Sequence, residues 1–108
     1  METLIEDGQA LVRPRGEIDL STVEKFRDVL NELIIQGHVN VLVDLDETRF
    51  IDSLGFGALV GARRKAHTFK GSLGIVCSTE RILRLFEVSG LDRVFTITDS
   101  VTSPATPG

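Results

Sequence analysis

Asp52 and Ser53 are the residues whose types and spacing best suit chemistry. They lie in the segment FIDSLGFG, residues 50–57, where a short loop leads into a predicted helix. The first turn of a helix has unpaired backbone amides and a partial positive charge. Ser53 can therefore be an N-cap that accepts an amide hydrogen bond, or an exposed hydroxyl that receives a phosphoryl group. The two roles are compatible, and the sequence leaves both open.

Asp19 is the second candidate. It ends the segment GEID, residues 16–19, between a predicted strand and a predicted helix. If the sheet is parallel there, this loop emerges at the same sheet end as Asp52 and Ser53, where open α/β sheets bind ligands. The alternative is a carboxylate that stabilises a turn beside a helix start. Both interpretations stay open at this point.

The glycines of residues 55–61 invite comparison with a dinucleotide-binding loop. In that fingerprint the first glycine directly follows the strand. Here residues 46–53 intervene, and Gly55, Gly57 and Gly61 fall inside the predicted helix. They are better explained by close packing of this helix on the sheet or on a partner.

Other reaction chemistries find no support in the residue pattern. Cys77 is the single cysteine, so neither an internal disulfide nor a thiolate metal site can form within the chain. His38 and His67 lack metal-ligand spacing, and Ser53 has no histidine base near it in sequence. The G-x-S-x-G elbow of hydrolases is absent. We therefore expect no catalytic residue, no metal and no cofactor.

Composition limits the class of protein. The 108 residues suit one domain, and the net charge of −4 argues against general nucleic-acid binding. Asp, Arg or Gly interrupts each apolar run well short of a membrane span, and the N-terminus lacks the basic region of a signal peptide. The cytoplasm is the expected location. The basic run at residues 63–65 indicates a solvated helix face or a partner contact.

These residues must be positioned by alternating strands and helices. The order β-β-α-β-α-β-α-β predicts an α/β fold, with helices packed on a small, mostly parallel mixed sheet of about four to five strands. The domain is expected over residues 1–98, followed by a flexible tail over 99–108. Residues 16–19 and 46–50 are predicted as connections. The predicted strands are 3–5 and 10–13, joined by a hairpin turn at Asp7-Gly8, then 39–45 (buried on both faces), 73–77 and 94–97.

Three helices are predicted from apolar residues at helical spacing. The first, 21–37, begins with a Ser21–Glu24 capping box and ends at Gly37 as a C-terminal cap. The second is 52–69 and the third is 80–88. The residues expected on their buried faces are Val23, Phe26, Leu30 and Leu33, then Leu59, Ala62, Ala66 and Phe69, and then Ile82, Leu85 and Phe86.

Four segments, in the same order, resemble the motifs of STAS domains. They are GEIDLST (16–22), VLVDL (41–45), FIDSLGFG (50–57) and LFEVSGL (85–91), and the resemblance runs from about Leu4 to Ile97. It is greatest to stand-alone bacterial anti-sigma factor antagonists. In that family the unphosphorylated protein binds an anti-sigma factor that is also a GHKL-type serine kinase, which frees the sigma factor. Phosphorylation ends the binding, and a PP2C-type phosphatase restores it.

The resemblance implies a role for each matching residue. Ser53 is the expected phosphoacceptor, Asp52 is expected to orient the site, and Asp19 is expected beside it on the partner surface. Leu54, Gly55 and Gly57 are expected to let the partner approach closely. Leu54 stands where many relatives have a second Ser or Thr, so the partner surface differs from theirs.

Two other function classes remain open from sequence. One is a non-switching STAS scaffold within a larger signalling or transport assembly. The other is a small nucleotide-binding domain that uses residues 55–61. The sequence also leaves homodimerisation, the sigma factor and the host undecided.

Overall fold

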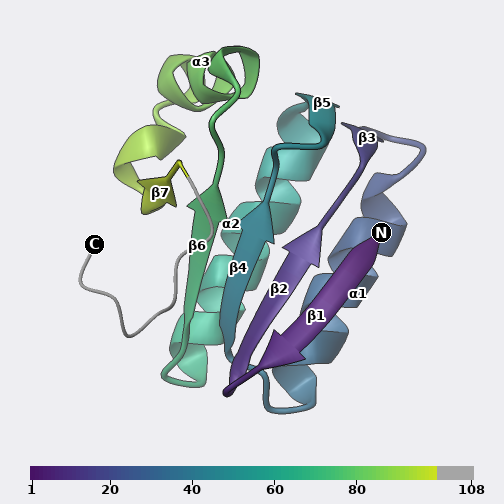
Figure 1. Ribbon diagram of the computed structural model, residues 1–108, viewed down its shortest axis with the longest axis vertical. Helices are drawn as coiled ribbons and strands as arrows, with labels where there is room; N and C mark the ends of the chain where they lie inside the picture. The colour runs from purple at the N-terminus through teal and green to yellow at the C-terminus, as the bar shows by residue number, and fades with distance from the viewer. Residues whose placement is uncertain (100–108) are drawn as a thin grey trace.

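A five-stranded sheet with the order β1-β2-β4-β6-β7 forms the centre of the protein (Figure 1). The computed structural model describes residues 1–99; of the tail predicted over 99–108, residues 100–108 lie outside them. β1 is antiparallel to β2, and the other neighbouring strands are parallel, which confirms the predicted mostly parallel mixed sheet. The strands are β1 (Glu2–Glu6), β2 (Gln9–Arg13), β4 (Asn40–Asp44), β6 (Ser72–Val76) and β7 (Ile97–Thr98).

The opening hairpin turns through two residues, as the Asp-Gly pair predicted. Asp7 has φ 50° and Gly8 has φ 80°, and Glu6 pairs with Gln9 across the turn. Positive φ at both central residues is the signature of the type I′ turn, whose twist matches that of the strands. The hairpin places β1 at the edge of the sheet.

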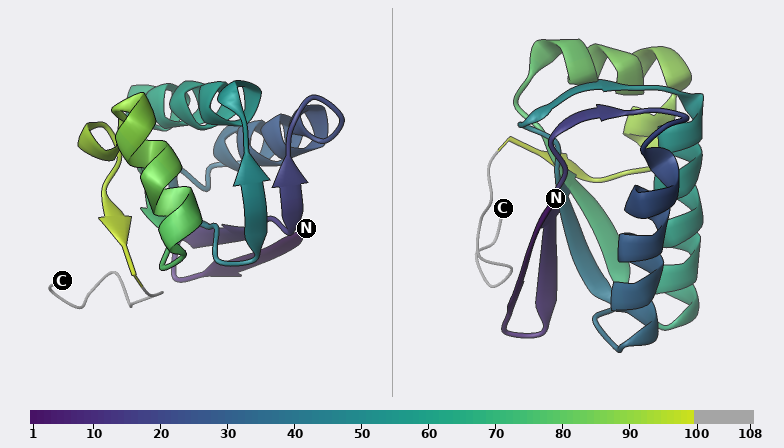
Figure 2. Two further views of the ribbon diagram at one scale, coloured as in Figure 1. Left: turned by 90° about the horizontal axis from the view of Figure 1, so that it is seen from above. Right: turned by 90° about the vertical axis from the view of Figure 1, so that its right-hand side faces the viewer.

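The helices α1 (Val23–Ile35) and α2 (Ser53–Thr68) lie side by side on one face of the sheet, and α3 (Glu80–Ser89) packs near its end (Figure 2). The predicted apolar faces are confirmed: the side chains buried there include Val23, Phe26, Leu30, Leu33, Leu59, Ala62 and Ala66. Phe69 was predicted to be buried but is 53% exposed, because it is the C-cap residue, beyond the last turn of α2. No helix among the described residues is both long and apolar enough to cross a membrane.

Within residues 1–99, helices cover only one face of the five-stranded sheet (Figure 2). β4 was predicted to be buried on both faces, but only Val41 and Val43 lie fully under the helices, and Leu42 is half-buried on the other face. Apolar content alone did not distinguish a central strand with one open face from one covered on both sides.

A second, two-stranded sheet pairs β3 (Gly16–Ile18) with β5 (Thr48–Ile51) in parallel. The predictions of a loop at 16–19 and a connection at 46–50 were therefore wrong at residues 16–18 and 48–50, which lie in these strands. Each strand is only three or four residues long and finds its hydrogen-bond partners in the other, far away in sequence. The amide of Gly16 donates to the carbonyl of Glu47 at 3.0 Å, and the hydroxyl of the buried Thr48 donates to the carbonyl of Pro14 at 3.2 Å.

Two element boundaries also differ from the prediction. α1 begins at Val23 with Thr22 in the N-cap position, so Ser21 and Glu24 form no capping box. The last strand is Ile97–Thr98 instead of 94–97, and a 3₁₀ turn (Leu91–Arg93) precedes it. The apolar character of that segment has another cause: Phe95 is buried, with its ring centroid 6.0 Å from that of Phe86.

The end of α1 follows the prediction closely. Gly37 has φ 99°, its amide donates to the carbonyl of Ile34, and the amide of His38 donates to that of Leu33. This pair of bonds is the Schellman motif, in which a glycine in the left-handed region closes the helix. The chain then enters β4.

Candidate functional site

The parallel pairing of β3 with β5 places Asp19 beside Asp52. Ile18 is in register with Ile51, and each aspartate is the next residue along its strand. The amide of Asp52 donates to the carbonyl of Ile18 at 3.1 Å, which holds the two loops together. The two loops therefore emerge at one sheet end, as expected, although the sheet is the small two-stranded one. Figure 1 shows β3 and β5 side by side, leading to the starts of α1 and α2.

Asp52 is the N-cap of α2. Its backbone is extended, and Oδ1 accepts the amides of Leu54 at 2.9 Å and Gly55 at 3.1 Å. These are two of the amides that a helix start leaves unpaired. The interpretation of Ser53 as the cap was therefore wrong by one residue.

Ser53 is the first helical residue and is exposed. Among the hydrogen bonds of residues 1–99, none involves its hydroxyl. Because Asp52 performs the capping, this hydroxyl is available to a partner or an enzyme. No group of three or more His, Cys, Asp or Glu that could hold a metal ion occurs in the same part of the chain.

Asp19 organises the loop before α1. Its Oδ1 accepts the amide of Ser21 at 3.0 Å and the hydroxyl of Ser21 at 2.7 Å. These hydrogen bonds from Ser21 hold the pKa of Asp19 below its ordinary value, because they stabilise the charged carboxylate. The turn-stabilising interpretation is thus confirmed, and it leaves a negative charge next to the Ser53 loop.

The three other residues predicted for the partner surface separate into two groups. Leu54 is 39% exposed, and Gly57 is exposed with open space where a side chain would begin. Gly55 is buried instead: a Cβ there would lie 2.6 Å from Cγ1 of Ile51 and 2.8 Å from Cγ2 of Ile18. Gly55 therefore lets the first turn of α2 contact both short strands, which confirms the predicted close packing for this glycine. Gly57 and Gly61 have open space where a side chain would begin, so they do not pack closely on the sheet.

Two exposed apolar side chains near the site were not predicted. Leu20 follows Asp19 and is 78% exposed, and Phe50 lies on β5, opposite Glu17, and is 42% exposed. Their only signal in the sequence was an apolar residue within a short polar segment. The basic run at residues 63–65 begins about 15 Å along α2 from Ser53, at 1.5 Å per residue, and lies outside the site.

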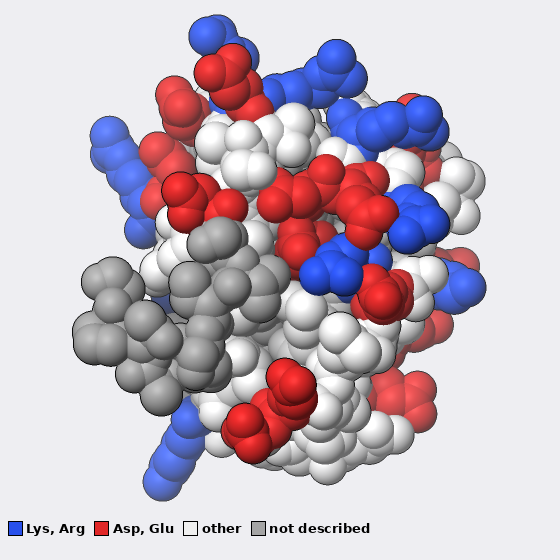
Figure 3. All heavy atoms as spheres, in the orientation of Figure 1, with Lys and Arg blue, Asp and Glu red and all other residues white. Residues whose placement is uncertain are grey.

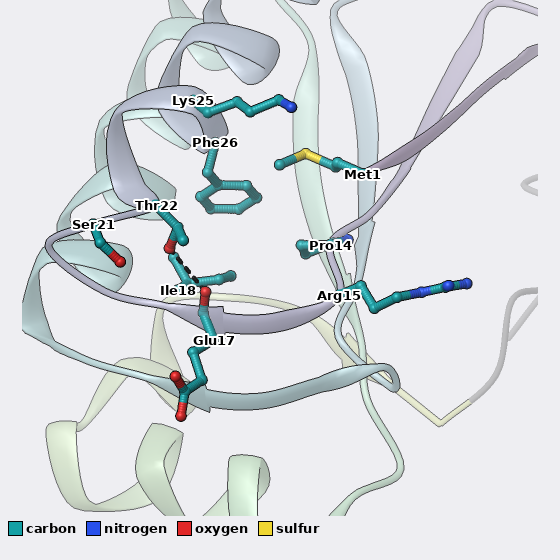
Figure 4. Close-up of a pocket in the computed structure, with 9 residues that line it drawn as sticks. All are labelled: Met1, Pro14, Arg15, Glu17, Ile18, Ser21, Thr22, Lys25 and Phe26. Atoms are coloured by element: carbon teal, nitrogen blue, oxygen red, sulfur yellow. Dashed lines mark hydrogen bonds between the residues drawn. The ribbon is translucent and has the colours of Figure 1, made fainter.

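A hollow of about 220 Å³ lies on the other side of β3 (Figure 4). Pro14 and Glu17 form one wall, Thr22 and Lys25 of the α1 start form the other, and Phe26 lies at its floor. The hydroxyl of Thr22 donates to the carbonyl of Glu17 at 2.8 Å across it. None of its lining residues comes from β5 or α2, so the hollow is separate from Ser53.

Comparison with known proteins gives consistent matches. The family model of the STAS domain matches residues 1–103. The anti-sigma-B factor antagonist of Staphylococcus aureus is 33% identical over 91 residues, which are 84% of each chain. An anti-sigma factor antagonist from Mycobacterium paratuberculosis superposes with a TM-score of 0.84 at 23% identity, covering 93% of this chain and 85% of that one. The Bacillus cell fate determinant SpoIIAA, in the phosphorylated form, superposes with a TM-score of 0.71 at 22% identity, covering 92% and 91%. At these identities the structural matches establish the fold.

Proposed function

The chain belongs to the STAS domain family, and from this we propose that it is an anti-sigma factor antagonist that is switched by phosphorylation of Ser53. The Staphylococcus aureus relative is named an anti-sigma-B factor antagonist, and anti-sigma factor antagonists are regulatory binding proteins rather than enzymes. In the proposed cycle the unphosphorylated protein binds an anti-sigma factor with GHKL-type serine kinase activity, and the sigma factor is released. A PP2C-type phosphatase resets the protein, and the exchange takes place in the cytoplasm.

The observation that carries the proposal is the free hydroxyl of Ser53. It is exposed on the first turn of α2, while its neighbour Asp52 satisfies the amides of Leu54 and Gly55. Because Asp52 caps the helix, the Ser53 hydroxyl makes no capping hydrogen bond that a kinase would have to break. Here a kinase can modify the hydroxyl without disturbing the helix start.

The charge of the phosphate provides the switch. A phosphoserine adds about −1.5 to −2 charge, beside the carboxylates of Asp52 and Asp19. Free amides and the helix dipole stabilise an anion at a helix start. Because Asp52 already accepts two of these amides, they stabilise the phosphate only in part. It stays at the surface, where desolvation and like-charge repulsion oppose the partner. A cost of several kcal/mol abolishes micromolar binding, which corresponds to about 8 kcal/mol.

The proposed partner surface surrounds this hydroxyl. Asp19 and Asp52 provide charge, Leu54 and Leu20 provide exposed apolar contact, and Gly57 lets the partner backbone approach. Gly55 acts from below, by holding the first turn of α2 on the two short strands. Phosphorylation changes the charge of this surface without any refolding.

The test begins with protein recovered from the native host, analysed by site-resolved mass spectrometry together with whatever copurifies. We expect phosphate on Ser53, and a GHKL-type kinase retained on a Ser53→Ala bait because that variant cannot be released. Ser53→Asp is expected to bind the kinase weakly. Thr68→Asp is the matched control and should bind as the wild type does, because Thr68 is exposed in the last turn of α2, about 22 Å along the helix from Ser53 at 1.5 Å per residue.

Two outcomes would count against the proposal. Binding of Ser53→Asp as tight as that of the wild type would show that charge at this position does not block the partner. Unmodified Ser53 under several growth and stress conditions, with no kinase recovered, would favour a non-switching scaffold.

A further inference from the structure

The sheet face that points away from α1 and α2 carries a row of apolar residues. The strand register aligns Leu4 with Leu11, Leu11 with Leu42, and Leu42 with Gly74, across four neighbouring strands. Their neighbours Ala10, Val12, Val41 and Val43 are buried under the helices, so the leucines point to the other face. Leu4 is 51% exposed, and Leu11 and Leu42 are half-buried.

Polar rows border this leucine row on both sides. The row on one side contains Glu2, Arg13 and Asp44. Nη1 of Arg13 lies 2.6 Å from Oε1 of Glu2, and its Nε lies 3.0 Å from Oδ2 of Asp44. On the other side Glu6 begins a row that continues through Gln9, Asn40 and Ser72. Figure 3 views this face: acidic atoms gather above and below a white band, and most basic atoms lie at the periphery.

The spacing of the row selects the shape of an occupant. Neighbouring strands are about 4.7–4.9 Å apart, and the polar rows lie about 6.8 Å along each strand from the leucines. An α-helix presents apolar side chains every three or four residues, at intervals of about 4.5–6 Å. A helix that crosses the strands can therefore contact every leucine of the row, whereas a segment running along a strand would meet one leucine between polar neighbours.

The charge of the face selects the chemistry of the occupant. Three carboxylates, those of Glu2, Glu6 and Asp44, flank the leucine row, and Arg13 is the one basic residue in the two bordering rows. Arg13 pairs with Glu2 and with the buried Asp44, so among the described residues of these rows Glu6 is the exposed carboxylate without an ion pair. A second copy of the chain would bring the same acidic groups against them, which is unfavourable. We propose that this face is a second docking surface, and that its occupant is an amphipathic helix of a partner protein with an apolar stripe between basic residues.

A hollow of about 370 Å³ adjoins the row at the edge of β6 that β7 leaves unpaired. Leu42, Gly74 and Thr96 line it, with Arg63 and His67 of α2 at the helical side. Because Arg63 is a cation and no carboxylate lines the hollow, it suits an apolar anchor of the helix better than one of its basic residues. Ser53 begins α2 on the opposite side of the sheet, so docking here is independent of the phosphorylation proposed above.

The test uses two synthetic helical peptides of about 18 residues with the same leucine pattern, one with lysine and one with glutamate at the flanking positions. Binding to the full-length, isotope-labelled protein is followed by amide chemical shifts. The lysine peptide is expected to shift the amides of Leu4, Leu11 and Leu42, and its affinity should fall as salt is added. Ser53→Asp should leave this binding unchanged.

Matched variants distinguish peptide binding at the leucine row from binding elsewhere on the protein surface. Leu11→Asn should weaken the lysine peptide about tenfold, whereas Ile35→Asn on α1 should not. Glu6→Lys should weaken it more than Glu87→Lys on α3 does. A dispersed spectrum of each variant establishes that it is folded. Equal binding of the two peptides, shifts confined to α1 and α2, or no shifts at all would overturn the proposal.

Discussion

Gly55→Ala tests the contact that positions Ser53. A Cβ at this position would lie 2.6 Å from Cγ1 of Ile51 and 2.8 Å from Cγ2 of Ile18. Ordinary carbon contacts are about 3.5–4.0 Å, so the added methyl overlaps both side chains by roughly 1 Å. Both isoleucines are buried, at 1% and 2% exposure, and have little room to move. The first turn of α2 must therefore shift away from the short strands.

The magnitude follows from two opposing effects. Overpacking of this kind costs about 1–3 kcal/mol, while replacing a helical glycine by alanine gains up to about 1 kcal/mol. Gly57→Ala is the matched control, because it lies in the same helix with nothing within 4 Å of its would-be Cβ. Gly57→Ala should stabilise the protein, and Gly55→Ala should be less stable than Gly57→Ala by about 1–3 kcal/mol. The difference isolates the steric cost.

Urea unfolding measures this difference directly. With a slope of about 1–3 kcal/mol per molar urea, the two midpoints should differ by roughly 1 M. Amide chemical shifts of Gly55→Ala should change at Asp19 and Ser53, since the shift of the turn moves one loop relative to the other. If Gly55→Ala unfolded at the same urea concentration as Gly57→Ala, the close packing of α2 on β3 and β5 would be refuted.

Three further predictions concern single sites. Ser21→Ala should raise the pKa of Asp19 toward the ordinary value of about 3.9, because it removes the hydroxyl donor; an unchanged pKa in a carboxyl NMR titration would contradict this. In the wild type the lowered pKa of Asp19 adds to the free energy of unfolding at pH values above about 3.9, the ordinary pKa of an aspartate. This stabilisation is lost as the pH falls through the lowered pKa. Burial raises the pKa of the Cys77 thiol and keeps it away from solvent. A disulfide reagent at pH 8 should therefore label Cys77 only as fast as the protein unfolds. Rapid labelling of the native protein would disprove the burial of this thiol. Gly71→Ala should lower the free energy of unfolding, measured by urea unfolding, by about 3 kcal/mol, because the added Cβ would overlap the carbonyl oxygen of Val39. Gly61→Ala is the control, since its Cβ would meet nothing within 4 Å. Equal stability of the two variants would show that the backbone at Val39 moves aside.

The three helices were predicted from the sequence because the pattern that predicts each one lies within the helix itself. The 3.6-residue period of Val23, Phe26, Leu30 and Leu33 reports which face of α1 is buried, whatever covers it. The Asp7-Gly8 turn is likewise specified by its own dihedral preferences. Such features depend on residues a few positions apart, so the sequence contains all the information that they need.

The short strands were not predictable in this way. β3 and β5 are too short to show a period, and each is held by hydrogen bonds to the other across about thirty residues of chain. The prediction of the last strand at 94–97 was wrong for a related reason. Phe95 is buried by its contact with Phe86, outside any strand, and the sequence does not distinguish that contact from burial in a sheet. Non-local contacts of this kind leave no local pattern.

The site divides along the same line. The sequence by itself determined that Asp19, Asp52 and Ser53 stand at helix starts, because their residue types and the glycines around them are suited to that position. Only the tertiary structure decided that Asp52 caps α2 and leaves Ser53 free, since both residue types cap well and the backbone path from β5 selects one of them. The structure also decided that Gly55 faces inward and that Leu4, Leu11 and Leu42 align, because burial and strand register depend on which segments meet.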